Sequence, residues 1–201
     1  MIKQTLNSVR ALLVLLFLTM SISVSAEEDI AGLMEERLQS LLKVIAAEHT
    51  ESDLDAELQK TVDYAAITRG VLGKHGKELT PEQVSRFQTE FEKSMNGLLV
   101  SALSSIGEFD LEIGEVKKRN EERAQVFAVV TTEKSERFEI VSSIAKESDD
   151  WLVRNLIVNG VNLGLTYRNQ FNALVTDLGD PVKAIDAWSE TVNNAFEAAS
   201  S

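Results

Sequence analysis

Apolar residues in the first half of the chain recur every three or four positions, which is the spacing of one face of an α-helix. The pattern runs from Ile30 to Ile45 and resumes in two shorter segments, Asp53 to Thr61 and Tyr64 to Leu72. These segments are separated by short polar stretches. The spacing therefore predicts a helical N-terminal half.

The clearest helix boundary lies at Thr80. A threonine can cap a helix, Pro81 suits the first turn, and Gln83 stands where a capping box requires an amide or carboxylate. The apolar stripe that follows extends to Ile106, and Gly107 can end the helix. We expect one long helix between Thr80 and Gly107.

After Gly107 the period changes from helical to alternating. Short polar segments separate the apolar runs, as in an antiparallel meander whose strands are joined by tight turns. Four strands are predicted: a first one through Phe109, Leu111 and Ile113, then Arg123 to Thr132, Arg137 to Ala145, and Trp151 to Val158.

A helical pattern returns in the last part of the chain. It covers Leu163 to Leu178, and Asp180 with Pro181 opens a final helix that extends to Phe196. The element order predicts an α+β fold: N-terminal helices, a four-stranded, mostly antiparallel sheet, and C-terminal helices packed on it.

The segment from Gln125 to Thr131 is apolar on both faces, whereas a strand with one wet face would alternate. Two arrangements explain it. Helices can cover both sides of a central strand as ordinary core, or one layer of helices can stand off the sheet and enclose an apolar cavity between sheet and helices. Periodicity does not distinguish the two.

The N-terminus has the parts of a secretory signal peptide. Lys3 and Arg10 precede an apolar run, and Val24-Ser25-Ala26 is a small-residue cleavage site. The uninterrupted apolar part, Ala11 to Leu18, is shorter than the roughly 20 residues that cross a bilayer. We expect residues 1–26 to be a signal peptide cleaved after Ala26, and residues 27–201 to form a single domain in the periplasm.

Composition excludes several functions. The formal net charge of −12 repels nucleic acid and disfavours adsorption to anionic lipid surfaces. There are no cysteines and only two histidines, which are not spaced as a metal pair, so no metal site is expected. No nucleophile, phosphate-loop or dinucleotide motif occurs. These features favour binding over catalysis, and we expect no enzyme.

Two groups of motifs resemble the MlaC family, also called the toluene-tolerance family. The first half contributes Asp63-Tyr64, Gly70 to His75, and Leu79 to Phe87 with Phe91; the second contributes Trp151-Leu152-Val153, Val158 to Leu163, and Tyr167 to Phe171. Their order and spacing cover most of the chain. The residues Gly76, Asn155, Asn159 and Asn162 depart from the usual Trp, Asp, Glu and Ser, as in a divergent member.

The resemblance implies a periplasmic phospholipid carrier that maintains the lipid asymmetry of the outer membrane. Family members hold acyl chains between a sheet and helices, with the head group largely outside. They exchange lipid with an inner-membrane ABC transporter complex and an outer-membrane lipoprotein–porin complex. On this resemblance we expect phospholipid as the cargo, no cofactor, and a monomer.

The residues expected to line the cavity are aliphatic and come from the long helix, the strands and the start of the penultimate helix. They are Leu98, Leu99, Leu103, Val126, Ala128, Val130, Ile140, Ile144, Val153 and Leu163. Arg168 is a candidate for contact with a lipid phosphate or a partner, although it could equally pair with an acid. Two alternatives stay open: an adaptor without a ligand, and an enzyme with His75 as base.

Overall fold

The computed structural model describes residues 26–46, 51–188 and 190. Helices α2 (Ala26–Ala46), α3 (Glu51–Gln59) and α4 (Tyr64–Leu72) come first, followed by the 3-10 turn η1 (Gly73–Lys77) and the long helix α5 (Pro81–Ile106). The expected signal peptide and the end of the expected last helix lie outside the described residues, apart from Ala26 and the helical residues 181–188.

A meander of antiparallel strands forms the sheet, in the order β1-β2-β3-β4-β5. The strands are β1 (Phe109–Asn120), β2 (Arg123–Thr132), β3 (Arg137–Glu147), β4 (Asp150–Val158) and β5 (Val161–Asn162), and helix α6 (Leu163–Leu178) follows. The α+β class is confirmed, but the sheet has five strands instead of the predicted four. Strand β5 is only two residues long, too short for apolar alternation to reveal it.

The capping residues form the contacts that their types predict. The hydroxyl of Thr80 accepts a hydrogen bond from the backbone of Gln83, whose side chain accepts one from the backbone of Thr80 in return. Gly107 follows α5 with φ at +68°, a conformation that suits glycine. The predicted boundaries of α5 are therefore confirmed.

Two β-bulges keep the apolar side chains on one face of the sheet. On β1 the register shifts between Ile113 and Val116, and on β3–β4 it shifts between Ser143 and Ile144. A bulge adds one residue to a strand, so apolar residues three positions apart can point the same way. The β1 bulge explains why the strand continues to Asn120 although the simple alternation ends at Ile113.

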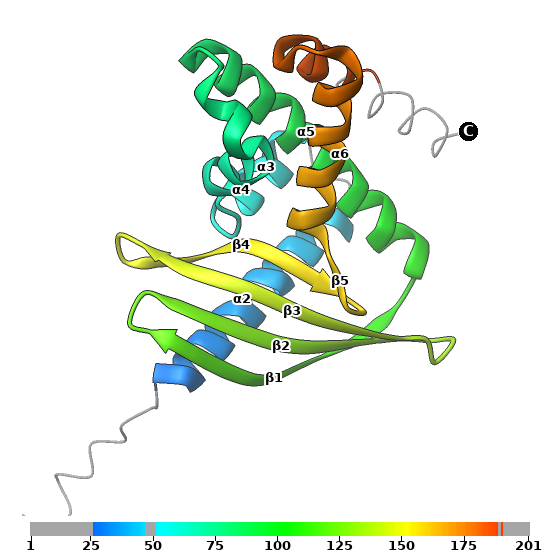
Figure 1. Ribbon diagram of the computed structural model, residues 1–201. Coiled ribbons are helices and arrows are strands. Elements are labelled where there is room, and N and C mark those ends of the chain that lie inside the picture. Colours follow the sequence, from blue (N-terminus) through cyan, green and yellow to red (C-terminus); the bar gives the residue numbers. More distant parts are fainter. Residues whose placement is uncertain (1–25, 47–50, 189, 191–201) are drawn as a thin grey trace, which may run out of the picture.

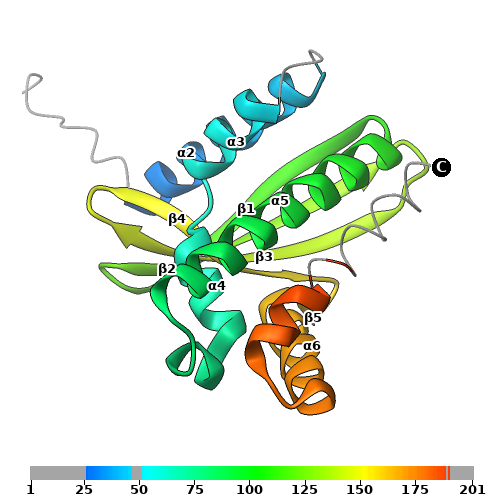
Figure 2. The same cartoon turned by 90° about the horizontal axis from the view of Figure 1, so that it is seen from above.

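Figures 1 and 2 show helices grouped on two sides of the sheet. Helix α2 crosses one face of the strands, which we call the inner face. Helices α4, α6 and residues 181–188 stand beyond the β4 edge with the first half of α5 (Figure 1). The outer edge of β4 is occupied twice: by β5, and by Val62, which bridges to Val153.

Three apolar clusters hold these parts together. An aromatic bundle joins α4, α5, α6 and residues 181–188, and a second cluster joins α2 to the inner face. The third lies where α2, α3 and α4 meet, with Leu41, Leu58 and Tyr64 at its centre. Within the described residues, no helix is long and apolar enough to cross a membrane.

Candidate functional site

The inner face of the sheet carries a continuous apolar surface. In an antiparallel sheet, residues directly opposite each other on neighbouring strands point to the same side. The observed register therefore places one set of side chains together on this face. They are Phe109, Leu111, Ile113, Val116, Ala124, Val126, Ala128, Val130, Phe138, Ile140, Ile144, Val153, Leu156 and Val158.

Helix α2 covers one end of this surface. Ile30 and Met34 of α2 pack in one cluster with Val126, Ile144 and Val153, and all five side chains are buried. Arg37 of the same helix fixes the contact through polar groups, since it donates to the Trp151 carbonyl at 2.6 Å and to Asp150 at 2.7 Å. Val126, Ile144 and Val153 therefore belong to a packed core beneath α2.

The other end of the inner face is covered less completely. Ala128 and Ile140 stay partly exposed, and Val130 is buried outside the three apolar clusters. Leu99 of α5 packs against the cluster beneath α2 and α3, whereas Leu98 is 42 % exposed. Leu103 and Leu163 are partly buried. The predicted lining residues thus divide into a packed set and a partly open set.

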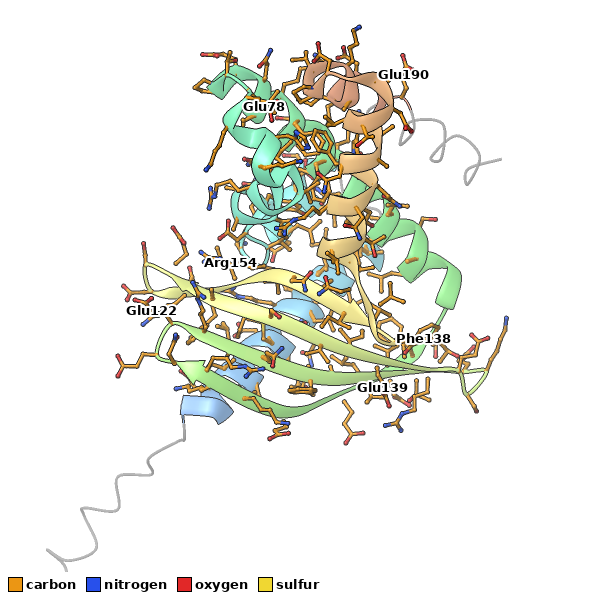
Figure 3. All side chains as sticks on the ribbon, viewed as in Figure 1. Glu78, Glu122, Phe138, Glu139, Arg154 and Glu190 are labelled. Atoms are coloured by element: carbon orange, nitrogen blue, oxygen red, sulfur yellow. The ribbon has the colours of Figure 1, made fainter. Side chains whose placement is uncertain are left out.

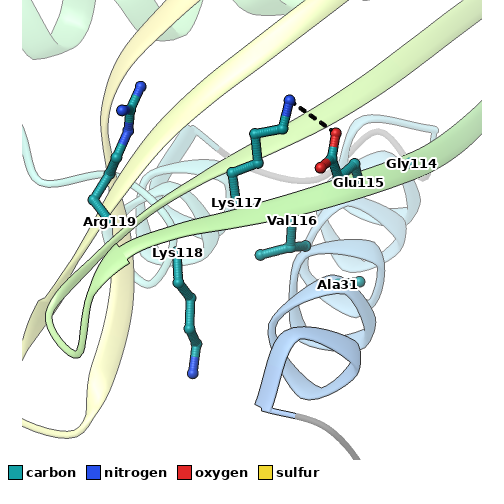
Figure 4. A pocket seen from close by; sticks show the side chains of 7 residues that line it. All are labelled: Ala31, Gly114, Glu115, Val116, Lys117, Lys118 and Arg119. Atoms are coloured by element: carbon teal, nitrogen blue, oxygen red, sulfur yellow. Dashed lines mark ion pairs between the residues drawn. The ribbon is translucent and has the colours of Figure 1, made fainter.

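Two surface hollows stand out, and neither is lined by any of the predicted cavity residues. The larger, of about 640 Å³, lies between Ala31 of α2 and the Gly114–Arg119 stretch of β1. Figure 4 shows Val116 on the α2 side of the strand, and Lys117 paired with Glu115 at 3.0 Å. Charges along an edge strand of this kind discourage pairing with another sheet.

The second hollow, of about 320 Å³, lies between α4, β4 and α6. Arg154 is at the β4 bulge and is fixed by Asp63 at 2.7 Å and Glu147 at 2.6 Å. Figure 3 labels Arg154 at this edge of the sheet. Arg168 of α6 lines the same hollow, and its Nε donates to the Gly70 carbonyl of α4 at 2.6 Å. The two arginines come from segments far apart in the sequence.

Asparagine side chains shape the start of α6. Asn162 caps the helix by accepting from the Leu165 amide at 3.0 Å, and Asn155 accepts from the Gly164 amide at 3.0 Å. A Cβ added to Gly164 would lie only 2.5 Å from the Asn155 Oδ1 atom, so the close approach requires glycine. Asn159, in the β4–β5 turn at φ +48°, exchanges hydrogen bonds with the Glu139 backbone.

Sequence reasoning singled out Arg168 but missed Arg154, Asn155, Asn162 and Gly164 as one site. The sequence does hold one signal for this site. Asn155 and Asn162 depart from the family pattern, and Asn is a frequent capping residue at the start of a helix. What no pattern indicated was the β4 bulge, which turns Arg154 to the sheet edge beside α6.

A buried polar chain crosses the middle of α5. The Tyr64 hydroxyl donates to Asn96, whose amide donates to Asp55 of α3 at 2.6 Å. Burial, together with the nearby carboxylates of Glu92 and Asp55, raises the pKa of Tyr64. These contacts tie the middle of α5 to α3 and α4.

The contacts of His75 are those of a residue that supports the fold. It is buried in η1, its Nδ1 is 3.2 Å from a Glu78 oxygen, and its ring meets Phe171 edge-on. Neither of the two hollows is lined by it. Across residues 26–46, 51–188 and 190, no group of three or more His, Cys, Asp or Glu side chains is placed to hold a metal ion.

Comparisons with known proteins agree with this architecture. The structure of a phospholipid-binding protein from Ralstonia solanacearum, solved in complex with a phospholipid, superposes with a TM-score of 0.66 over 84 % of this chain and 90 % of that one, at 20 % identity. The toluene tolerance protein Ttg2D of Pseudomonas putida is 31 % identical over 73 % of this chain and 69 % of its own length. The family model of the MlaC protein matches residues 34–190. This chain belongs to the MlaC family.

Proposed function

We propose that this protein is a periplasmic carrier that binds phospholipid and moves it between the inner and outer membranes. The observation that carries the proposal is the uneven covering of the inner sheet face, which is packed beneath α2 and partly open beyond it. Membership of the MlaC family supports the same role, as does the name of the phospholipid-binding protein that shares the fold.

The energetics of lipid transfer explain why a protein surface of this kind is needed. At ~0.8 kcal/mol per methylene, exposing two chains of ~16 carbons to water costs on the order of 25 kcal/mol. Noncovalent affinities reach only about 18–21 kcal/mol, so an apolar site recovers much of this cost but not all of it. Exchange between bilayer and carrier is then nearly balanced. The carrier itself needs no fuel, and its docking partners set the direction.

The acyl chains would lie on the open part of the inner face. Ala128 and Ile140 would form its floor beside the buried Val130, and Leu98, Leu99 and Leu103 of α5 would form its wall. Small and aliphatic side chains suit this use, because a lipid tail has no polar group that would need a hydrogen-bond partner. Val126, Ile144 and Val153 would support the site from the core beneath α2.

Location and partners complete the proposal. A signal peptide over residues 1–26 would direct export, with cleavage after Ala26. The net charge of −12 disfavours direct adsorption to anionic membranes, so lipid would pass through protein complexes: an ABC transporter assembly at the inner membrane and a lipoprotein–porin complex at the outer membrane. N-terminal sequencing of the protein from the periplasmic fraction tests the export step, and the sequence should begin at Glu27.

The central experiment asks whether the protein leaves its compartment with lipid bound. The protein is purified from the periplasm without detergent, extracted with organic solvent, and analysed by mass spectrometry. We expect stoichiometric phospholipid. Protein that is free of lipid and does not take any up from labelled vesicles would contradict the proposal and favour an adaptor without a ligand.

Two substitutions on one strand locate the lipid. Ala128 faces the inner side of β2 and Val129 the outer side, and both are partly buried. Ala128→Phe should fill the open part of the inner face and lower the bound lipid about tenfold or more, whereas Val129→Phe should leave the lipid content unchanged. Equal effects of both substitutions would place the lipid elsewhere.

A further inference from the structure

Two arginines line the hollow between α4, β4 and α6, although the chain as a whole is acidic. Arg154 and Arg168 both line it, together with the polar side chains of Asn155 and Asn162. None of the described residues that line it carries a carboxylate. Two carboxylates outside the lining, those of Asp63 and Glu147, pair with Arg154. Arg168 has no such partner among the described residues, and an unpaired guanidinium that lines a hollow favours an anionic ligand.

Arg168 has unused hydrogen-bonding capacity. A guanidinium has five N–H donors, and the Nε donor of Arg168 is engaged by the Gly70 carbonyl at 2.6 Å. Within the part of the chain that the structure describes, no ion pair includes this side chain. The contact with Gly70 fixes the direction of the guanidinium while its terminal nitrogens remain available to an oxyanion.

Arg154 is held at the same hollow by a different route. Its Nε and one terminal nitrogen are taken by Asp63 and Glu147, and only 30 % of its side chain is exposed. These two carboxylates balance its charge but also immobilise it. A fixed guanidinium loses little conformational entropy when it binds a ligand through its remaining nitrogen.

Helix α6 adds positive potential from its first turn. The helix has 16 residues, and the aligned peptide dipoles place a partial positive charge at its N-terminus, near Asn162 and Gly164. Asn155 and Asn162 satisfy amides of that turn with neutral oxygens, so the caps do not cancel the potential. The absence of a Cβ at Gly164 leaves room for the Asn155 Oδ1 atom, which accepts from the Gly164 amide.

We propose that this hollow is a binding site for a phosphate group, with Arg168 as the principal ligand and Arg154 and the start of α6 as supports. Planar guanidinium groups match the oxygens of phosphate through paired hydrogen bonds. The hollow, of about 320 Å³, is of a size to hold a phosphate and part of its ester. The phosphate can come from a lipid head group at the β4 edge or from a small soluble phosphate ester.

Titration with inorganic phosphate tests the site directly. The arginine Nε–Hε signals of the purified protein are followed by NMR, with chloride at equal ionic strength as the reference. The Arg168 signal should shift and saturate with phosphate, and Arg168→Gln should weaken binding about tenfold, the loss expected for one charge-assisted hydrogen-bond pair. Arg69→Gln, which removes an exposed charge on α4 outside the hollow, should change nothing.

A second pair of variants tests the site even if Arg168→Gln does not fold. Asn162→Asp keeps a helix cap but puts a carboxylate into the hollow, and it should weaken phosphate binding, whereas Asn162→Ser keeps the cap without charge and should not. A linear shift without saturation, equal responses in the Arg168 and Arg69 variants, or no difference between the Asn162 variants would overturn the proposal.

The source of the phosphate is decided by comparing ligands. If glycerol 3-phosphate binds as inorganic phosphate does, the site takes a soluble ester. If short-chain phosphatidylglycerol alone binds more tightly than inorganic phosphate, and Ala128→Phe removes this difference, the site receives the head group of the cargo. This outcome rests on the proposed carrier function. Equal competition by acetate would show a carboxylate site and contradict a phosphate ligand. A lipid-free protein that still binds phosphate would refute the carrier function alone.

Discussion

The aromatic bundle and the inner sheet face are both apolar, yet they are packed in different ways. In the bundle, Phe87, Phe91 and Phe171 are at most 1 % exposed and meet Trp188 and Tyr167 through tilted and edge-on ring contacts. On the inner face beyond α2, Ala128 and Ile140 are aliphatic and partly exposed. Rings in fixed mutual geometry specify one packing, whereas aliphatic surfaces adapt to more than one shape.

This difference suggests that the aromatic bundle provides stability and that the inner face is used for binding. The bundle can hold α4, α5 and α6 rigidly, so that α5 remains in place whether or not the inner face is occupied. In the proposed carrier, the inner face would then accept and release an acyl chain without disturbing the core that keeps the protein folded. The variants below test whether the two regions are independent.

The largest effect is expected in the bundle. Phe87→Ala removes a fully buried ring that contacts Phe91, Phe171 and Trp188, and it should lower the free energy of unfolding by about 3–5 kcal/mol. Chemical denaturation measures the loss. Leu178→Ala, at a residue that is 41 % exposed, is the control and should cost less than about 0.5 kcal/mol. A small loss for Phe87→Ala would show that the bundle is not the rigid region.

The second-largest loss of stability is expected at the contact between β4 and α6, which lies between the two regions. Gly164→Ala would place a Cβ 2.5 Å from the Asn155 Oδ1 atom, and the required shift of β4 against α6 should cost about 1–3 kcal/mol. In the double variant with Asn155→Ala the clash is gone, so its loss should be smaller than the sum of the two single losses. Additive losses would show that the two residues do not collide.

A smaller effect is expected where α2 is attached to the sheet. Arg37→Ala removes the hydrogen bonds to the Trp151 carbonyl and to Asp150, and should cost about 1–2 kcal/mol. Hydrogen exchange should accelerate in α2 while the amides of α4 and α6 keep their protection. Asp150→Asn, which alters only the exposed partner, should have the weaker effect. Equal acceleration in both regions would contradict their independence.

The smallest effect is a pH dependence at the junction of α3, α4 and α5. The pKa of Tyr64 is raised in the folded state, so its contribution to stability is complete while the pH stays below the unfolded value of about 10. Above that pH the unfolded chain releases the proton first, and stability falls. Denaturation between about pH 8 and pH 11 should show a shallower fall in Tyr64→Phe than in the unmodified protein.

Tyr167 provides the comparison within the bundle. Its pKa is raised by burial alone, whereas Tyr64 also has the nearby charges of Glu92 and Asp55. Tyr167→Phe should therefore reduce the alkaline loss less than Tyr64→Phe does. The reverse order would show that the carboxylates around Tyr64 do not act on it.

Much of the fold could be predicted from the sequence. The capping box at Thr80, the stop at Gly107 and the strand from Arg123 to Thr132 were predicted at the residues where the structure has them. The alternation on β1 was followed only to Ile113, because the bulge there interrupts the period that identifies a strand. The lining residues stay a prediction: they come from the long helix, the strands and the start of α6, and they line neither of the two hollows.

The sequence by itself determined the helices, the meander, the charge and the motifs of the family, because these depend on residue type and on spacing along the chain. Only the tertiary structure decided which apolar residues are core and which remain open, since that depends on where α2 packs on the sheet and where α5 packs against α2 and α3. It also brought Arg154 and Arg168 to one hollow, through a bulge and a helix crossing that leave no local pattern. Local chemistry forms the elements; their packing creates the sites.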